Sequence, residues 1–227
     1  MLVSDSIKDE LFSNVRLLFV FTNLRVSLSN AMSSKYISVE AREPLVNIVE
    51  TIRRSEKVIV KYIEEILNEF DIYTEFLKKV KGIGPVISGK LIFFIKDIER
   101  FLTVAKLWRY AGLGVDDDGK AERMRKGQKP RFNPRFKGLM YNVGVVLVRS
   151  KSKYKRIYDK AKEYYQANRD WTKSHIHLAA MRKMEKLFLS HVWMVWRELE
   201  GLPVRDPYPV EYLGHSTILY PWEFIED

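Results

Sequence analysis

The stretch Val80–Lys90 reads VKGIGPVISGK and holds residue types from which proteins build phosphate sites. Gly82 and Gly84 permit a backbone turn that side chains would obstruct, and they leave backbone amides uncovered. Unpaired N–H groups at the start of the following helix, together with its dipole, favour a phosphate oxygen. We expect the hydrophobic residue between the glycines, Ile83, to pack between the two flanking helices.

Nearby lysines would add electrostatic attraction for a phosphate: Lys79, Lys81 and Lys90. Backbone amides contact phosphate rather than base edges, so this turn would bind without sequence preference. A purely structural turn is the alternative.

A second group of cations lies in the basic segment Gly119–Gly138, which contains one acidic residue, Glu122. Its eight basic residues are Lys120, Arg123, Arg125, Lys126, Lys129, Arg131, Arg135 and Lys137. Counterion release makes such a cluster a salt-sensitive anchor for nucleic acid. Phe132 and Phe136 could stack on unpaired bases, but we expect both to pack in the core.

Other residues offer weaker chemistry. Three consecutive acids at 116–118 precede Gly119 and are more typical of a turn than of a Mg²⁺ site. His175 and His177 lie two apart on an expected helix and face different directions, so no zinc site is expected. Trp193, Trp196 and Tyr165 are interpreted as core aromatics. The sequence therefore predicts no catalytic residue, no metal site and no cofactor.

The charge is unevenly distributed along the 227 residues. Residues 1–75 carry 9 Lys/Arg against 12 Asp/Glu, residues 76–200 carry 29 against 12, and residues 201–227 carry 1 against 5. A basic middle region of +17 favours a polyanionic partner, although a solubility surface is the alternative.

The chain has no cysteine, which excludes disulfides and thiolate chemistry. No uninterrupted apolar run approaches the length of a membrane span, so no membrane partner is expected.

Apolar residues recur at helical spacing through most of the chain, which predicts an all-α fold. We expect a first helix with a capping box at Ser6-x-x-Asp9, and a long helix from about Pro44 to Phe70. The apolar stripe of the long helix suits a helical hairpin or a coiled-coil dimer seam. Further helices are expected near 73–80, from Pro85, after Thr103, from Pro134 and over 172–199, with a loop or β-ribbon at 115–133. The predicted organisation is a helical arm (1–72), a helix-hairpin-helix domain (73–200) and an irregular strap (201–227).

These residues together resemble a known family. The stretch from Val80 to Gly114, the basic loop after it, NPRFKGLMY and HLAAMRKMEKLF are similar in order to the C-terminal helix-hairpin-helix domain of insertion-sequence transposases of the IS one-ten/one-sixteen type. The resemblance covers roughly residues 70–200. It implies a DNA-binding domain that, in the family, works with an N-terminal RuvC-like domain holding Mg²⁺ and with a serine nucleophile.

The sequence departs from this family on both catalytic parts. Only about 70 residues precede the hairpin and they read as helical, so no RuvC-like domain is expected there. No serine or threonine occurs from Val104 to Arg149, and Lys129 falls about where the serine would be expected. Only Ser88 or Ser150, brought in by folding, could replace it.

The sequence thus favours a non-catalytic, transposase-like DNA-binding protein acting in transposition or recombination. Its expected partners are DNA, which could be branched or structured, and a second copy bound through the N-terminal helices; RNA stays an alternative. The expected location is cytoplasmic and nucleoid-associated. Two other hypotheses are a recombinase subunit completed by a separate nuclease chain, and a protein-binding scaffold.

Overall fold

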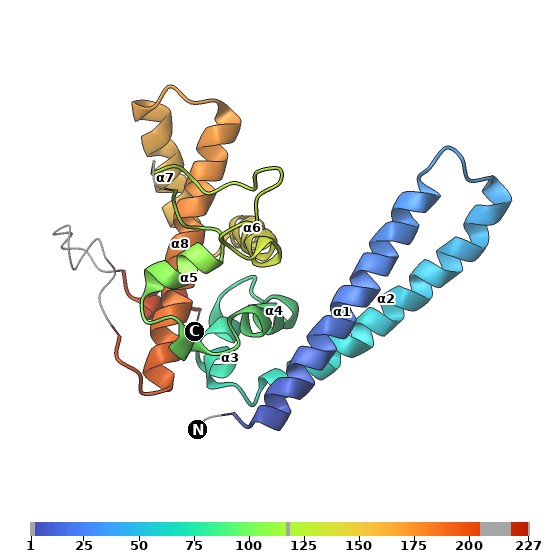
Figure 1. Cartoon of the computed structure of the whole chain (residues 1–227), viewed down its shortest axis with the longest axis horizontal. Coiled ribbons are helices and arrows are strands. Elements are labelled where there is room, and N and C mark those ends of the chain that lie inside the picture. Colours follow the sequence, from blue (N-terminus) through green and yellow to red (C-terminus); the bar gives the residue numbers. More distant parts are fainter. Residues whose placement is uncertain (1–2, 117–118, 205–218, 227) are drawn as a thin grey trace. The chain divides into compact units, whose positions relative to one another are not determined.

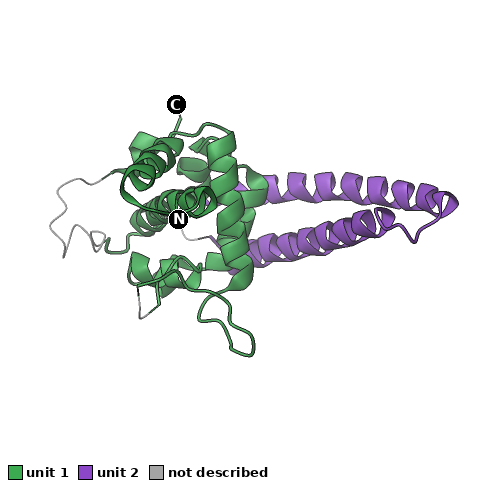
Figure 2. Ribbon diagram, turned by 90° about the horizontal axis from the view of Figure 1, so that it is seen from above, with its two compact units in different colours: residues 1, 71–227 green, residues 2–70 purple. Residues whose placement is uncertain are grey.

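The computed structural model describes residues 3–116, 119–204 and 219–226, and in these residues the fold is all-α, as predicted (Figure 1). The chain divides into two compact units, residues 2–70 and residues 71–227 (Figure 2). The first contains α1 and α2, and the second contains all the later helices.

The first unit is an antiparallel pair of long helices, α1 (Asp5–Met32) and α2 (Val39–Leu67) (Figure 2). One partly buried polar link joins the two helices, because Thr22 Oγ1 and Arg25 Nε both donate to the carboxylate of Glu56, at 2.8 and 2.7 Å. The apolar stripe expected on the long helix is largely buried at Ile52, Ile59, Ile63 and Ile66. Apolar residues also lie exposed on both helices, among them Leu17, Val20, Leu24, Ile48, Val58 and Tyr62.

Two predicted boundaries of the first unit were wrong. Helix α1 is capped by Ser4, whose hydroxyl accepts from the amide of Ile7, rather than by a box at Ser6. Helix α2 begins at Val39, five residues before Pro44, and is capped by Ser38. A proline in the first turns of a helix removes at most one backbone hydrogen bond, so it does not have to mark the first residue.

Helix α1 is long and apolar enough to span a membrane by length and composition, and it is the one such helix in the described residues. Its hairpin partner α2 is rich in charged side chains, including Arg53, Arg54, Lys57 and Lys61. Charges inside a bilayer are costly, so a hairpin of these two helices is better suited to water.

In the second unit, the long helix α8 (Lys173–Leu199) is the central element, and its buried side chains occupy all sides of its C-terminal half. Four other α-helices contact it: α3 (Asp71–Glu75), α5 (Val104–Tyr110), α6 (Pro134–Arg149) and α7 (Lys155–Asn168). The indole of Trp193 on α8 donates to the carbonyl of Phe101, in the connection that precedes α5, at 2.7 Å. Trp193 and Trp196 are therefore core aromatics, as predicted.

The remaining elements of this unit are short. The 3₁₀ turn η1 (Leu77–Lys79) precedes α4 (Pro85–Ile95), and η2 (Ile98–Arg100) connects α4 with α5. Residues 221–224 form the 3₁₀ turn η3 (Pro221–Phe224), and Phe224 is fully buried against Tyr154 and His191. Most of the predicted strap, residues 205–218, lies outside the described residues.

Candidate nucleic-acid interface

The glycine turn (Val80–Gly84) connects η1 with α4, and one of its glycines is required by geometry. Gly82 has φ +92°, a conformation that side-chain-bearing residues rarely adopt. A Cβ added at Gly82 would lie 2.6 Å from Ser150 Oγ and 2.9 Å from a methyl group of Val146. The turn can therefore pack on the C-terminal end of α6 only because residue 82 is glycine.

Gly84 has a different role from Gly82. Its φ of −92° and ψ of −177° are open to any residue, and a Cβ there would meet nothing within 4 Å. Gly84 is the N-cap of α4 and Pro85 follows at the first helical position. No hydrogen bond among the described residues uses the amide of Gly84 or of Val86 as donor. The start of α4 thus presents two unpaired amides beside open space, which is the arrangement that favours an anion.

Ile83 is buried with 4% of its surface exposed, as expected for a residue that packs behind the turn. Its amide donates to the carbonyl of Val80 at 3.0 Å and closes the turn. Lys90 lies farther along α4 and is half-buried, so it is not part of the rim of the turn.

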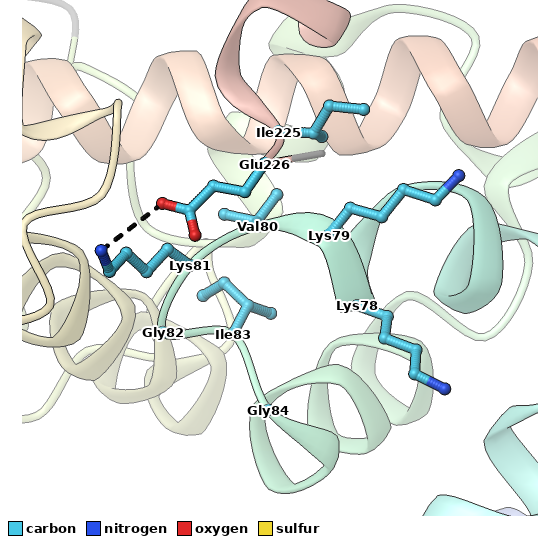
Figure 3. A pocket seen from close by; sticks show the side chains of 9 residues that line it. All are labelled: Lys78, Lys79, Val80, Lys81, Gly82, Ile83, Gly84, Ile225 and Glu226. Atoms are coloured by element: carbon cyan, nitrogen blue, oxygen red, sulfur yellow. Dashed lines mark ion pairs between the residues drawn. The ribbon is translucent and has the colours of Figure 1, made fainter.

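The lysines on the turn are exposed but partly paired. Lys79 contacts Glu75 at 3.1 Å, and Lys81 contacts Glu226 at 3.7 Å. Lys78, which the sequence did not single out, is also exposed. The turn, the three lysines, Ile225 and Glu226 line a groove of about 780 Å³. In Figure 3 the side chains of Lys81 and Glu226 point toward each other, while Lys78 and Lys79 extend away from that pair.

The C-terminal residues hold one wall of this groove. The amide of Glu226 donates to the carbonyl of Lys79 at 2.8 Å, and Lys153 Nζ donates to the carbonyl of Ile225 at 2.6 Å. Arg156 contacts Glu223 at 3.4 Å and stacks on the ring of Phe224. Glu226 thus places a carboxylate beside Lys81 in this groove.

The cations of the basic segment are mostly exposed to solvent. All but one of its predicted contact residues are exposed: Lys120, Arg123, Arg125, Lys126, Lys129, Arg131 and Arg135. Phe132 and Phe136 are buried, as predicted. Up to Asn133 the segment is irregular apart from one bridge between Val115 and Ala121, and its last five residues form the start of α6.

Lys137 differs from the other cations of the basic segment because it points inward. Its Nζ donates to the carbonyl of Glu122 at 2.7 Å and lies 4.6 Å from the ring centre of Phe132. Burial lowers the pKa of Lys137, with a further contribution from the nearby guanidinium of Arg182. Lys137 therefore supports the fold of the segment.

The glycine turn and the basic segment lie at opposite ends of α6. The turn packs against Ser150 at its C-terminal end, and the basic segment runs into Pro134 at its N-terminal end. The 16 residues of α6 give a length of about 24 Å at ~1.5 Å per residue. The two predicted groups are therefore separated by the length of a helix.

A basic run near the turn was missed by the sequence reasoning. Residues 149–156 read RSKSKYKR and contain five cations without an acid. This run begins at the end of α6, where Ser150 Oγ donates to the carbonyl of Lys81 at 3.1 Å. The absence of acids in RSKSKYKR could have indicated a second basic site from the sequence alone. The position of this run at the end of α6 that contacts the turn depends on tertiary packing.

The two serines that folding could have brought to the site differ in position. Ser88 is fully buried, and its hydroxyl has no hydrogen-bond partner among the described residues. Ser150 does lie at the turn, where its hydroxyl donates to a backbone carbonyl.

The acidic and histidine candidates do not form a metal site in the described part of the chain. The carbonyl of Asp116 accepts from the amide of Gly119 and its carboxylate from the amide of Lys120, which is a turn; Asp117 and Asp118 lie outside the described residues. His191 is buried between Tyr154 and the carbonyl of Leu219, and His177 contacts the hydroxyl of Tyr158.

These observations define an all-α protein with a basic, partly paired turn at one end of α6 and an exposed basic segment at the other. Residues 74–159 match the sequence model of the transposase IS116/IS110/IS902 family. This part of the chain is therefore a transposase domain of that family, as the sequence motifs predicted. The match begins within α3, ends within α7 and includes both the glycine turn and the basic segment. Among curated proteins, none matches the chain.

Proposed function

We propose that this protein binds DNA as part of a transposition or recombination process, and that it holds the phosphate backbone without cutting it. The observation that carries the proposal is the open start of α4, where the amides of Gly84 and Val86 have no hydrogen-bond partner among the described residues. An anion-binding helix start within a transposase-type domain has DNA phosphate as its natural ligand.

The charges around the turn and on the basic segment support the same partner. Lys78, Lys79 and Lys81 line the groove at the glycine turn. The run 149–156, whose Ser150 contacts the turn, adds five cations, of which Lys155 pairs with Asp159 and Arg156 with Glu223. The exposed basic segment would contact phosphates about 24 Å away, at the other end of α6. One duplex reaching both would span about seven base pairs at ~3.4 Å each.

The glycine turn in this proposal is a helix-hairpin-helix element, with α3 and η1 before the turn and α4 after it. Because amides and lysines contact only the backbone, binding by this element would be independent of base sequence. The glycine turn would supply affinity for the DNA backbone and position the protein on it. Selection of a base sequence would depend on contacts other than those of the turn.

A second copy of the chain is the further partner that we propose for the first unit. The exposed apolar residues on α1 and α2, among them Leu17, Val20 and Ile48, lie outside the buried stripe of the hairpin. Sedimentation analysis of the wild type and of a Leu17→Glu, Val20→Glu variant tests this. A monomeric wild type contradicts it.

The test of DNA binding uses substitutions of Gly84, because its Cβ position is open. In Gly84→Asp, the new carboxylate would accept hydrogen bonds from the first amides of α4 and would repel phosphate, while the N-cap conformation is kept. Gly84→Ala leaves the amides free and is the control.

We expect Gly84→Asp to weaken duplex binding about tenfold or more and to reduce the slope of log K against log salt by ~0.9 for each lost phosphate contact. Gly84→Ala should bind within about threefold of the wild type. If Gly84→Asp binds DNA with unchanged affinity and an unchanged salt slope, the phosphate role of the glycine turn is wrong.

A further inference from the structure

The connection between α7 and α8 carries an exposed group of aromatic rings. Trp171 stacks on His175 with the ring centres 4.2 Å apart and the planes 10° from parallel. Tyr165 contacts the same indole at 5.4 Å, and Tyr164 contacts Tyr165 at 5.7 Å. We name these four residues the aromatic cluster.

The cluster is open to solvent, although the sequence indicated a core role for Tyr165. Trp171 is 37% exposed and Tyr164 is 55% exposed, whereas Tyr165 is half-buried between them and the helices. Leaving large aromatic surface in water is unfavourable, so a group of exposed rings marks an interaction surface.

Hydrogen bonds hold the backbone that carries the aromatic cluster. The amide of Arg169 donates to the carbonyl of Tyr165, and the amide of Trp171 donates to the carbonyl of Arg169, both at 3.0 Å. Thr172 caps α8 by accepting from the amide of His175 at 3.2 Å. Because these bonds fix the backbone and the Trp171 and His175 rings already stack on each other, a ligand stacking on the rings would lose little further entropy.

Two cations lie next to the rings, together with the exposed acid Asp170. The guanidinium of Arg169 lies 5.7 Å from the indole centre of Trp171, and Lys173 is exposed two residues after the indole. Flat rings beside cations suit a nucleobase stacked on the indole with its phosphate on Arg169 or Lys173. An apolar peptide would gain nothing from these charges.

One residue of the cluster, His175, lies on the same helix, α8, as an anchor of the chain before the basic segment. Arg182 donates to the carbonyls of Gly112 and Leu113, at 3.3 and 2.7 Å, just before that segment begins. Arg182 follows Lys173 by nine residues on α8, which corresponds to about 14 Å. A strand held by the basic segment could therefore continue toward the rings.

We propose that the aromatic cluster is a stacking site for an unpaired base of single-stranded nucleic acid. This inference rests on the proposed function in taking nucleic acid as the partner, but it concerns a different surface and a different form of the ligand. In a paired duplex the bases are stacked on one another, so the cluster would distinguish unpaired from paired strands.

The experiment measures anisotropy of labelled oligothymidine of about 20 nucleotides, which exceeds the ~4–16 nucleotides bound by single-strand-binding folds. A blunt duplex of the same length is measured in parallel. The variants are Trp171→Ala, Trp171→Phe, Gly84→Asp and, as a control for losing an exposed ring elsewhere, Tyr141→Ala. Thermal unfolding of each variant checks its fold.

We expect Trp171→Ala to weaken oligothymidine binding about tenfold, the effect of removing one stacked base, with duplex affinity changed less than about twofold. Trp171→Phe keeps a ring and should retain most of the affinity, and Tyr141→Ala should match the wild type. Binding of oligothymidine should also quench tryptophan emission in the wild type more than in Trp171→Phe.

Three outcomes overturn the stacking site: unchanged oligothymidine affinity in Trp171→Ala, an equal loss on duplex and single strand, or no oligothymidine binding by the wild type. The glycine turn is tested separately by Gly84→Asp on duplex. A loss there with no effect of Trp171→Ala removes the stacking site alone. A single-strand effect of Trp171→Ala with unchanged duplex binding by Gly84→Asp removes the turn alone.

Discussion

The hydroxyl of Ser150 donates a hydrogen bond to the carbonyl of Lys81, at 3.1 Å, across 69 residues of sequence. This contact places the C-terminal end of α6 directly behind the glycine turn and leaves no room for a side chain at residue 82. The turn is therefore a product of tertiary packing as well as of its own two glycines.

The two glycines of the turn should respond differently to alanine. Gly82→Ala adds a Cβ at φ +92° and 2.6 Å from Ser150 Oγ, so we expect a loss of about 1–3 kcal/mol in the free energy of unfolding. Gly84→Ala should cost about 1 kcal/mol or less, because its Cβ meets nothing and only the N-cap preference is affected. Urea unfolding of both variants measures the difference, and equal losses would contradict the assigned roles.

The carboxylate of Glu226 should compete with DNA for the turn. Glu226→Gln removes the charge beside Lys81 with little change of shape, so duplex affinity should rise roughly two- to fivefold at low salt. Glu65→Gln is the matched control, since Glu65 pairs with Lys61 on α2 and does not line the groove. An equal gain in both variants would mean that only net charge matters.

Lys137 and Arg135 lie two residues apart at the start of α6. Substitution of Lys137 should lower the stability of the fold, whereas substitution of Arg135 should weaken DNA binding. Lys137→Met loses the bond to the carbonyl of Glu122, and we expect about 1 kcal/mol of destabilisation with an unchanged salt slope. Arg135→Ala should leave stability unchanged and lower the salt slope by ~0.9. Thermal melts and salt titrations of the two variants check this, and a reversed pattern would refute it.

His191 should make the fold sensitive to acid. Its Nε2–H donates to the carbonyl of Leu219 and its Nδ1 accepts from the hydroxyl of Tyr154, which fixes a neutral ring. Burial lowers the pKa of His191 from 6.5 to about 4. Between these values the unfolded chain binds the extra proton, so stability is full above pH ~6.5 and falls as the pH drops toward 4.

Replacing this ring should remove the effect. We expect the wild type to lose about 2 kcal/mol from this group between pH 6.5 and 5, and His191→Gln to show a correspondingly flatter dependence. Urea unfolding at pH 7, 6 and 5 measures the difference in slope. Parallel profiles for the two proteins would show that His191 titrates normally in the fold.

The all-α fold class could be predicted from the sequence because apolar spacing and the residue types at helix starts are properties of residues close together in the chain. Pro85 and Pro134 do begin helices, and Thr103 is an N-cap position. Pro44 misled the prediction, because proline is also accepted within the early turns of a helix. Local chemistry thus predicted helix existence better than helix ends.

The orientation of individual cations could not be read from the sequence. Lys137 and Arg135 have the same kind of neighbours along the chain, yet one points inward and the other is exposed. The pairing of Lys81 with Glu226 joins residues 145 positions apart, and no local pattern indicates it. Composition predicted a basic surface, and tertiary packing decides which charges are free.

The length of α6 restricts how a relative of this protein could change. Each inserted residue would lengthen the helix by ~1.5 Å and also rotate everything beyond it by about a quarter of a turn or more. A single insertion would turn the basic segment away from the side on which it now lies. Only insertions or deletions of nearly whole turns, in steps of ~5.4 Å, would alter the spacing between the two basic regions while keeping the direction of one relative to the other.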